Sequence, residues 1–449
     1  MSALQTTPFL TDLSRHIWDV KYRYRSGEAV HDGSLQDTWR RVARALAAVE
    51  PADAAGWEGR FYGALEGFRF LPGGRILAGA GTGHRVTLFN CFVMGQIEDS
   101  LDGIFDALKE GALTMQQGGG VGYDFSTLRP SGAAAASTGA IASGPVSFMR
   151  IWDSMCATIL STGARRGAMM ATLRCDHPDI GEFVSAKQDQ SQLRHFNLSV
   201  QVTDAFMAAV RNGEEWPLVF PAARLGAAAG ETVLREWPGE HRPVACRVLG
   251  KVPARALWER ILRGAYDYAE PGVLFVDRIN RLNNLWYRER IGASNPCGEI
   301  PLPSYGACDL GSLNLTCFVR EPYSPRAGLN LEALAEAAAL AVRMLDNVID
   351  ASRFPLERQA EQARGGRRIG LGVTGLADAL ILLGLRYGEP AARELAGRAM
   401  RTVCHAAYHA SIGLAREKGS FPFFEQEPYL RGEFVRGLPE DIREGIARH

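Results

Sequence analysis

The sequence predicts an α/β protein, because segments typical of strands alternate with segments typical of helices between residues 71 and 384. Short apolar runs, such as residues 88–94 and 272–277, have the length of buried strands. Amphipathic stretches, such as residues 100–117 and 331–350, have the apolar spacing of helices. This alternation is found in α/β barrels and in doubly wound sheets, and the residues alone leave both architectures open.

The composition is that of an ordinary globular protein, with 46% apolar and 22% charged residues. The 50 basic and 50 acidic residues cancel, so neither a nucleic-acid surface nor a polybasic membrane face is expected. The N-terminus lacks the pattern of a signal peptide, and no apolar run reaches the roughly 18 residues that cross a bilayer. Eight cysteines without a CxxC pair predict a cytoplasmic protein, in which a functional cysteine pair is catalytic more often than structural.

The N-terminal region is expected to be helical. Residues 34–50 carry apolar side chains at helical spacing, with Ser34 as the N-cap, and a second helix is expected over residues 57–68. We therefore predict a helical domain over residues 1–70 and one α/β domain over residues 71–449.

The next helix is expected over residues 100–117, with Ser100 as its N-cap and the glycines 118–120 as its end. Residues 118–130 are typical of a glycine turn that enters a strand, and they match neither GxGxxG nor a Walker loop. Residues 131–144 have the small-residue composition of a mobile loop.

A helix is predicted over residues 145–160, followed by a loop that places Arg165 and Arg166 between glycines. Arginines in this setting suit phosphate binding and a solvated turn equally well. Asp176 stands between a cysteine and a histidine, but we interpret it as the N-cap of a helix that starts near Pro178, rather than as a metal ligand.

Further along the chain, residues 195–210 predict a strand with an attached helix, and residues 253–268 predict a helix. Residues 211–252 show no clear periodicity and are interpreted as connecting structure. Residues 367–384 predict a strand, a glycine turn and a helix.

The stretch from residue 291 to 315 carries Asn295, Cys297 and Glu299 at alternate positions. In an extended segment these three side chains would face one ligand, although Pro296 and Gly298 favour a tight, exposed turn. Cys308 follows Cys297 by eleven residues. The alternative is an ordinary loop with a buried cysteine, and Cys91 inside its apolar run also has the pattern of a core residue.

Taken together, these motifs resemble the large catalytic subunit of ribonucleotide reductase. The residues that carry the resemblance lie in order along nearly the whole chain: TLFNCFV (87–93), NPCGE (295–299), GACDLGSLNL (306–315), RRIGLGVTGLADA (367–379) and EKGSFPFF (417–424). The resemblance implies a ten-stranded α/β barrel with a central finger loop, preceded by a helical region. It also implies a barrel that is incomplete at the C-terminus, because chains of this family continue with further strands.

The resemblance implies reduction of ribonucleotides to 2′-deoxyribonucleotides for DNA synthesis and repair. Cys297 would be the thiyl radical that abstracts the ribose 3′ hydrogen, Glu299 the general base, and Asn295 a hydrogen-bonding partner of the ribose hydroxyls. Cys91 and Cys308 would supply the reducing electrons and end as a disulfide. The residues implied to line the substrate are Asn90, Gly119, Gly120, Asn295, Cys297 and Glu299.

The short interval between Cys297 and Cys308, together with residues 72–82 and 118–130, looks like the adenosylcobalamin-dependent class II enzymes. A dithiol protein such as thioredoxin would be the reductant, and a separate C-terminal polypeptide would complete the enzyme. Two alternatives remain: a non-catalytic nucleotide-binding remnant, and a catalytic subunit of the iron-dependent class I.

The resemblance also implies a homodimer with a deoxynucleoside triphosphate effector at a specificity site. Asp99 and Ser100 match the region that binds the effector ribose, and Arg129 matches a phosphate contact. Residues 131–140 match the first specificity loop, and residues 160–168, with Arg165, match the second.

Overall fold

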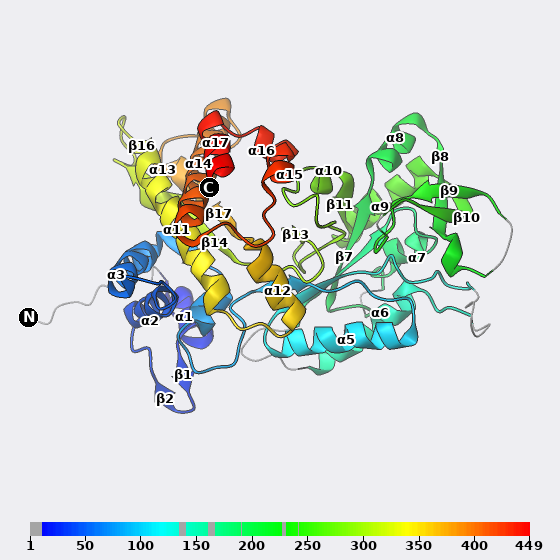
Figure 1. The fold of residues 1–449 in the computed structure, drawn as a ribbon, viewed down its shortest axis with the longest axis horizontal. Coiled ribbons are helices and arrows are strands. Elements are labelled where there is room, and N and C mark those ends of the chain that lie inside the picture. Colours follow the sequence, from blue (N-terminus) through cyan, green and yellow to red (C-terminus); the bar gives the residue numbers. More distant parts are fainter. Residues whose placement is uncertain (1–10, 134–140, 160–166, 190, 227–229, 241) are drawn as a thin grey trace, which may run out of the picture. The chain divides into compact units, whose positions relative to one another are not determined.

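The computed structural model describes residues 11–133, 141–159, 167–189, 191–226, 230–240 and 242–449. The chain forms two compact units, coloured along the sequence in Figure 1. Unit 1 consists of Met1–Asn90 and Cys308–His449, and unit 2 consists of Cys91–Ala307. The chain therefore crosses between the units directly before Cys91 and directly before Cys308. The predicted domain boundary at residue 70 stays a prediction.

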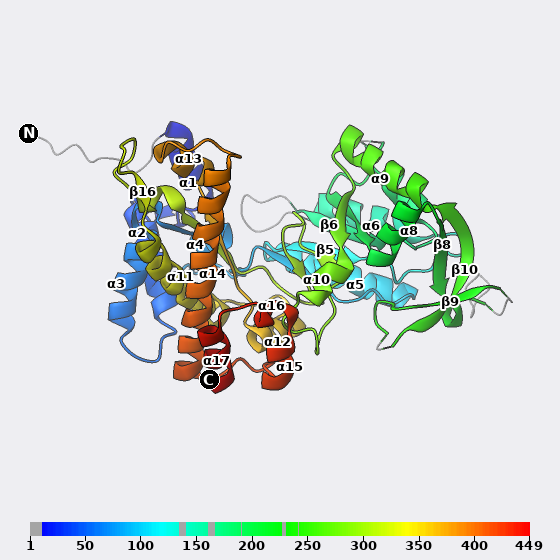
Figure 2. The ribbon, with the colours of Figure 1, turned by 90° about the horizontal axis from the view of Figure 1, so that it is seen from above.

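Unit 1 is mainly helical. Its two longest helices, α11 and α14, pack side by side (Figure 2). Its described helices are α1 (Asp12–Lys21), α2 (Leu35–Ala47), α3 (Ala54–Leu65), α4 (Gly74–Gly79), α11 (Leu331–Ala351), α12 (Glu357–Gly366), α13 (Leu376–Leu382), α14 (Pro390–Lys418), α15 (Gln426–Arg431), α16 (Glu433–Arg436) and α17 (Glu440–Arg448).

The sequence explains where α2 begins and which face it buries. Ser34 accepts a hydrogen bond from the amide of Asp37, and the Asp37 carboxylate accepts one from the amide of Ser34, which makes a capping box. Val42 and Leu46, one turn apart, are completely buried. The predicted helix and its N-cap are confirmed.

Unit 1 also contains a three-stranded sheet in the order β17-β14-β3. Its strands are β3 (Phe70–Pro72), β14 (Leu310–Asn314) and β17 (Gly370–Thr374). β14 runs parallel to β17 and antiparallel to β3, and α11 packs against all three strands. Two small ribbons pair β1 (Arg25–Ser26) with β2 (Ala29–Val30), and β15 (Val319–Arg320) with β16 (Gly328–Leu329).

Unit 2 is built on a five-stranded, fully parallel sheet in the order β11-β7-β6-β5-β4. Helices connect its strands, as the alternation in the sequence predicts. The strands are β4 (Cys91–Val93), β5 (Gly120–Asp124), β6 (Met169–Arg174), β7 (Phe196–Val202) and β11 (Gly272–Phe275). The helices are α5 (Leu101–Gln116), α6 (Pro145–Thr158), α7 (Ile180–Ser185), α8 (Asp204–Asn212), α9 (Ala254–Tyr268) and α10 (Val276–Arg281).

Aromatic side chains fill the space between this sheet and two of its helices. The rings of Tyr123 and Phe125 contact Trp152 of α6, with ring centroids 5.7 and 5.3 Å apart. The Tyr123 hydroxyl donates to the carbonyl of Ala107 in α5 at 3.2 Å. This face of the sheet is the hydrophobic core of unit 2, and the opposite face is left for the candidate site.

The prediction that residues 211–252 are connecting structure is wrong. They form an antiparallel sheet in the order β8-β10-β9, which lies at one end of unit 2 (Figure 2). Two features hide the strands in the sequence: prolines at positions 217 and 221 lie in the edge strand, and a bulge between Val248 and Gly250 interrupts the alternation. The strands are β8 (Glu215–Pro221), β9 (Thr232–Arg235) and β10 (Val244–Pro253).

The prediction that Asp176 is an N-cap is also wrong, because α7 begins at Ile180 and Asp179 stands at the N-cap position. The Asp176 carboxylate instead accepts two hydrogen bonds of 2.8 Å from the guanidinium of Arg174. Both side chains are nearly completely buried, and a buried guanidinium without a carboxylate partner would cost more than a missing helix cap.

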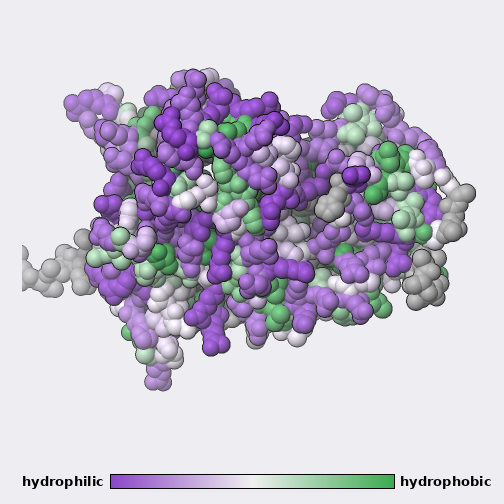
Figure 3. All heavy atoms as spheres, viewed as in Figure 1, coloured by the Kyte–Doolittle hydropathy of each residue, from purple (hydrophilic) through white to green (hydrophobic). Residues whose placement is uncertain are grey.

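The other helices and strands predicted from the sequence agree with the structure, whereas the loops predicted over residues 131–144 and around Arg165 lie largely outside the described residues. The Ser100 hydroxyl caps α5 by accepting from the amide of Gly103, and the segments predicted as helices around residues 145–160 and 253–268 are α6 and α9. Hydrophilic residues cover most of the face seen in Figure 3, with small hydrophobic groups between them. Among the described residues, no helix combines the length and the apolar character needed to cross a membrane.

Candidate functional site

The segment that carries Asn295, Cys297 and Glu299 is the tip of a β-hairpin. Its arms are β12 (Ala293–Ser294) and β13 (Pro301–Leu302), which pair antiparallel. The amide of Gly298 donates to the carbonyl of Asn295 at 3.0 Å, so residues 295–298 form a β-turn. Proline suits the second position of such a turn, and Gly298 accommodates its φ of 80°.

The turn corrects the expectation that the three side chains share one side of an extended strand. Asn295 is completely buried, whereas Cys297 and Glu299 are exposed. The turn's hydrogen bond reverses the chain between Asn295 and Gly298, so the alternation of an extended strand does not apply. The expectation of a tight turn, which rested on Pro296 and Gly298, is confirmed.

The buried Asn295 amide group is only half satisfied. Its Oδ1 accepts from the amide of Ile300 at 3.0 Å, which closes the hairpin loop. Its Nδ2 is buried and has no hydrogen-bond partner among the described residues. A buried donor without a partner is costly, so Nδ2 is available to a ligand acceptor at this position.

The hairpin lies on the face of the parallel sheet opposite the aromatic core, where β12 packs against β5 and β6. A Cβ atom on Gly122 would stand 1.9 Å from the carbonyl oxygen of Ser294, so only glycine allows this approach. Gly298 lies over Met170 of β6. The residues that the strand register places on this face include Cys91, Gly120, Gly122, Asp124, Met170, Thr172, Asn197 and Gln201.

Two side chains of this sheet face hold the hairpin backbone. The Thr172 hydroxyl lies 3.0 Å from the carbonyl of Gly292, and it accepts from Gln201 Nε2 at 3.1 Å. Asn197 Nδ2 donates to the carbonyl of Pro296 at 2.6 Å. Sequence reasoning missed these residues. The signal that could have found them is the alternation of polar with apolar residues in parallel strands, which are usually apolar on both faces.

Asp124 lies beside the base of the hairpin. Its Oδ1 accepts from the amide of Ser126 at 2.9 Å, and a Cβ on Gly292 would meet its Oδ2 at 3.0 Å. Burial raises the pKa of the Asp124 carboxyl, and the hydrogen bonds from Ser126 and Gln201 only partly oppose this.

The two predicted partner thiols are both buried. Cys91 begins β4 in unit 2, in register with Gly120 and on the hairpin side of the sheet. Cys308 belongs to unit 1, where its carbonyl accepts from the amide of Asn90 at 3.3 Å. The Asn90 side chain accepts from the amide of Arg75 at 3.1 Å, so its carbonyl oxygen already has one partner within unit 1.

The two glycines predicted to line the substrate differ in orientation. Gly119 faces the helical side of the sheet, because a Cβ there would meet the Phe92 ring at 2.8 Å and Thr114 at 3.0 Å. Its amide donates to the carbonyl of Thr114. Gly120 lies on the hairpin side, beside Cys91.

Three of the four predicted effector residues, Asp99, Ser100 and Arg129, lie at the start of α5. Arg129 Nε lies 2.7 Å from Asp99 Oδ2, and Ser100 stands at the N-cap of the helix. Burial raises the pKa of the Asp99 carboxyl, and Arg129 opposes that rise. Arg165 and most of the two predicted specificity loops, residues 134–140 and 160–166, lie outside the described residues.

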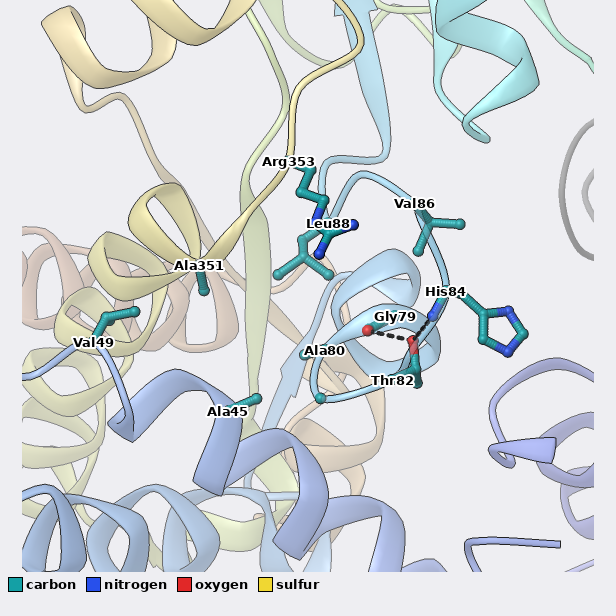
Figure 4. A pocket seen from close by; sticks show the side chains of 11 residues that line it. Ala45, Val49, Gly79, Ala80, Thr82, His84, Val86, Leu88, Ala351 and Arg353 are labelled. Carbon is teal, nitrogen blue, oxygen red and sulfur yellow. Dashed lines mark hydrogen bonds between the residues drawn. The ribbon is translucent and has the colours of Figure 1, made fainter. Parts of the chain in front are cut away.

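A separate pocket of about 270 Å³ lies within unit 1 (Figure 4). Its walls come from α2, the turn after α4, the segment up to Leu88 and the end of α11. Thr82 donates to the carbonyl of Gly79 in one wall, and the His84 ring points away from the pocket. None of the predicted site residues lines it, so this pocket is separate from the candidate site.

Two family models match the chain. The model described as "Ribonucleotide reductase, barrel domain" matches residues 89–443, and "Ribonucleotide reductase, all-alpha domain" matches residues 8–85. The first match alone covers more than half of the chain. These matches confirm the predicted fold class, an α/β barrel of this type preceded by a helical region.

Curated relatives match most of this chain. It is 43% identical over 404 residues to a "Vitamin B12-dependent ribonucleoside-diphosphate reductase" of Mycobacterium tuberculosis. The matched region covers 89% of this chain and 54% of the relative. A protein with the same description from Thermoplasma acidophilum is 36% identical over 397 residues, and the match covers 88% of this chain and 48% of that relative. A "Ribonucleoside-diphosphate reductase subunit alpha" of Chlamydia trachomatis is 30% identical over 445 residues, and the match covers 94% of this chain and 42% of that relative. The chain thus spans about half the length of these relatives.

Proposed function

Because this chain belongs to the ribonucleotide reductase family, we propose that it reduces ribonucleotides to 2′-deoxyribonucleotides through a thiyl radical on Cys297. One observation carries the proposal. The hairpin presents the Cys297 thiol at an exposed turn, next to the buried and unpartnered amide donor of Asn295, over a sheet face that carries the second thiol, Cys91. The names of the relatives favour a ribonucleoside diphosphate as the substrate.

Three residues of the hairpin act on the ribose. The Cys297 thiyl takes the hydrogen atom from C3′, and the Glu299 carboxylate accepts the proton of the 3′-hydroxyl. Asn295 Nδ2 donates a hydrogen bond to a ribose hydroxyl, which gives this buried group the partner it lacks. Exposure of Cys297 and Glu299 at the turn is compatible with both roles.

Cys91 and Cys308 supply the electrons. The C2′–O bond breaks and the hydroxyl leaves as water, while a hydrogen replaces it at C2′. The two thiols give up two electrons and two protons, and an S–S bond forms between them. The hydrogen bond from the amide of Asn90, the residue before Cys91, to the carbonyl of Cys308 supports this pairing. An external dithiol, such as thioredoxin, then reduces the disulfide.

We assign radical generation to adenosylcobalamin. The exposed Cys297 side chain can be reached by a group outside the hairpin, which fits this assignment. When bound, the cofactor supplies the radical that oxidises the Cys297 thiol. The higher identity to relatives described as B12-dependent than to the relative described as a subunit alpha supports this assignment over the iron-dependent class.

We also assign a deoxynucleoside triphosphate effector to the start of α5, with Asp99, Ser100, Arg129 and Arg165 as its contacts. The proximity of Asp99 and Arg129 supports a site for a ribose and a phosphate together. Homodimerisation is supported by the exposed apolar side chains Leu101 and Phe105 on the same helix. A cytoplasmic location completes the proposal.

The test is deoxynucleotide formation by the purified chain. The assay contains a ribonucleoside diphosphate, adenosylcobalamin, a dithiol and a C-terminal fragment taken from a relative. We expect turnover that depends on adenosylcobalamin and is abolished by Cys297→Ser. The matched control is Cys317→Ser, which changes an exposed thiol of unit 1 outside the site and leaves turnover intact.

The outcomes separate the alternatives. Turnover by the Cys297→Ser variant would refute the thiyl mechanism. Turnover that ignores adenosylcobalamin but needs a second, metal-containing protein would identify the iron-dependent class. Effector binding without turnover under any complementation would identify a nucleotide-binding remnant.

A further inference from the structure

We infer that Asn197 is a positioning residue for Cys297, and this inference rests on the proposed function. Asn197 lies on β7, on the sheet face below the hairpin and in register with Met170 of β6. Its Nδ2 donates to the carbonyl oxygen of Pro296 at 2.6 Å. Pro296 directly precedes Cys297, so this hydrogen bond reaches the backbone next to the thiol that the mechanism uses.

The geometry of the peptide bond makes this contact effective. The carbonyl oxygen of Pro296 and the Cα of Cys297 belong to one planar peptide unit, so fixing the oxygen restricts the Cα. The proline ring fixes φ on the other side of the same carbonyl. The turn bond from Gly298 to Asn295 closes the segment. With the Asn197 bond, the backbone around Cys297 is held from three directions.

Packing in the core of the sheet does not explain the asparagine at position 197. The strand around it is largely buried, with Phe196 and Leu198 facing the core, whereas Asn197 itself is exposed. The one hydrogen bond that its side chain makes in the described part of the chain goes to the hairpin, 99 residues away in sequence. This long-range hydrogen bond indicates that the Asn197 side chain positions the hairpin turn.

Asn197 contacts a different part of the hairpin from the other residues that hold it. Thr172 bonds the carbonyl of Gly292, before the first arm, and Gly122 allows the close approach of Ser294. Both contacts lie at the first arm or at the residue that directly precedes it. Asn197 acts on the turn, which carries the reactive thiol. Its loss should therefore disturb the turn and spare the rest of unit 2.

The experiment compares Asn197→Ala, Asn197→Asp and the matched control Asn212→Ala in the full chain. Asn212 is an exposed asparagine of α8 that donates to Glu214, away from the hairpin. Hydrogen exchange at the amides of Gly298 and Ile300 reports on the turn directly and does not depend on enzyme activity. Unfolding in denaturant checks that each variant folds.

We expect exchange at these two amides to become about tenfold faster in Asn197→Ala, as the loss of one hydrogen bond allows, and to be unchanged in Asn212→Ala. In Asn197→Asp, the introduced carboxyl can donate to the Pro296 carbonyl only while protonated. Its hairpin protection should therefore be near wild type at low pH and fall as the pH rises through the titration of that carboxyl.

In the complemented turnover assay, kcat should fall for Asn197→Ala while KM stays near the wild-type value, because the thiol is misplaced and the substrate contacts remain. Wild-type exchange at the turn in Asn197→Ala would overturn the inference, and so would faster exchange with unchanged kcat. These outcomes are distinct from failure of the proposed function, which would appear as turnover by Cys297→Ser or as no turnover by the wild-type chain; the exchange measurement at the turn is independent of both.

Discussion

At the hairpin tip, one β-turn gives neighbouring residues different environments. Asn295 is completely buried with a spare donor, while Cys297 and Glu299 are exposed. A buried amide is suited to fix a substrate hydroxyl, because its unpartnered donor gains a hydrogen bond there. Exposed groups are suited to react with it. In the proposed mechanism, Asn295 therefore binds the substrate, and Cys297 and Glu299 react with it.

Glu299→Gln should separate these roles. The amide keeps the shape of the side chain but cannot accept the 3′-hydroxyl proton. In the complemented turnover assay, we expect kcat to fall by about 10²- to 10⁴-fold, the usual contribution of a general base, with little change in KM. A Glu299→Gln variant whose kcat stayed within twofold of wild type would remove Glu299 from the mechanism.

Individual residues could be identified from the sequence to the extent that their chemistry is visible in their type and spacing. Asn295, Cys297 and Glu299 were predicted as site residues in this way. Their arrangement was not predicted, because it depends on a hydrogen bond from the amide of Gly298 to the carbonyl of Asn295. Asn197 was missed, because an asparagine in a strand carries no reactive group and its partner lies far away in sequence.

Among the elements, the hairpin depends on a strand that leaves room for it. β5 has glycine at position 122, where the backbone of Ser294 approaches so closely that no Cβ fits. The neighbouring Thr172 and Asn197 then bond the hairpin carbonyls. The parallel sheet thus serves as the rigid support on which the turn is built.

Gly122→Ala should test this support. The added methyl group would collide with the Ser294 carbonyl, so β12 must move away from β5. We expect a loss of about 1–3 kcal/mol in the free energy of unfolding, measured in denaturant, together with faster hydrogen exchange in residues 291–302.

The control is Gly63→Ala in α3, where a Cβ meets nothing within 4 Å. That variant should be more stable by about 0.5–1 kcal/mol, as for glycine replaced inside a helix. Equal stability of Gly122→Ala and wild type would mean that the hairpin is not seated on β5.

Elements were predictable where local signals decide them. α2 and α5 have capping serines and an apolar face, and both begin where the sequence predicts. The sheet of β8, β9 and β10 was missed, because prolines and a bulge break its alternation and its stability comes from packing among side chains distant in sequence.

For the molecule as a whole, the two crossings between the units fall directly before Cys91 and Cys308. Asp309, which directly follows Cys308, is 2% exposed, and neither of its carboxylate oxygens has a hydrogen-bond partner in the described part of the chain. Burial raises the pKa of Asp309 well above its usual range; Asp346 adds to this, and Arg367 opposes it.

This shift makes stability depend on pH. The folded chain keeps a proton on Asp309 that the unfolded chain releases above a pKa of 3.8, so the carboxyl favours unfolding increasingly as the pH rises. Asp309→Asn cannot ionise. Denaturant unfolding should therefore show this variant to be more stable than wild type at pH 8, with the gain disappearing near pH 3. A gain that is equal at both pH values would show that Asp309 is not held protonated by the fold.

At this scale the alternation of strands and helices was sufficient to predict a parallel α/β sheet, which unit 2 contains. It was not sufficient to choose between a barrel and a doubly wound sheet, because both have the same local pattern. The choice came from the family resemblance and from the match to the barrel-domain model over residues 89–443.

The central claim is that Cys297 takes the hydrogen atom from C3′ of the ribose. The most direct test is the reduction of a ribonucleoside diphosphate that carries deuterium at C3′, compared with the unlabelled substrate in the complemented assay. We expect the deuterated substrate to be reduced more slowly by the wild-type chain, and neither substrate to be reduced by Cys297→Ser. Equal rates for the two substrates, together with deoxynucleotide formation by Cys297→Ser, would contradict the mechanism.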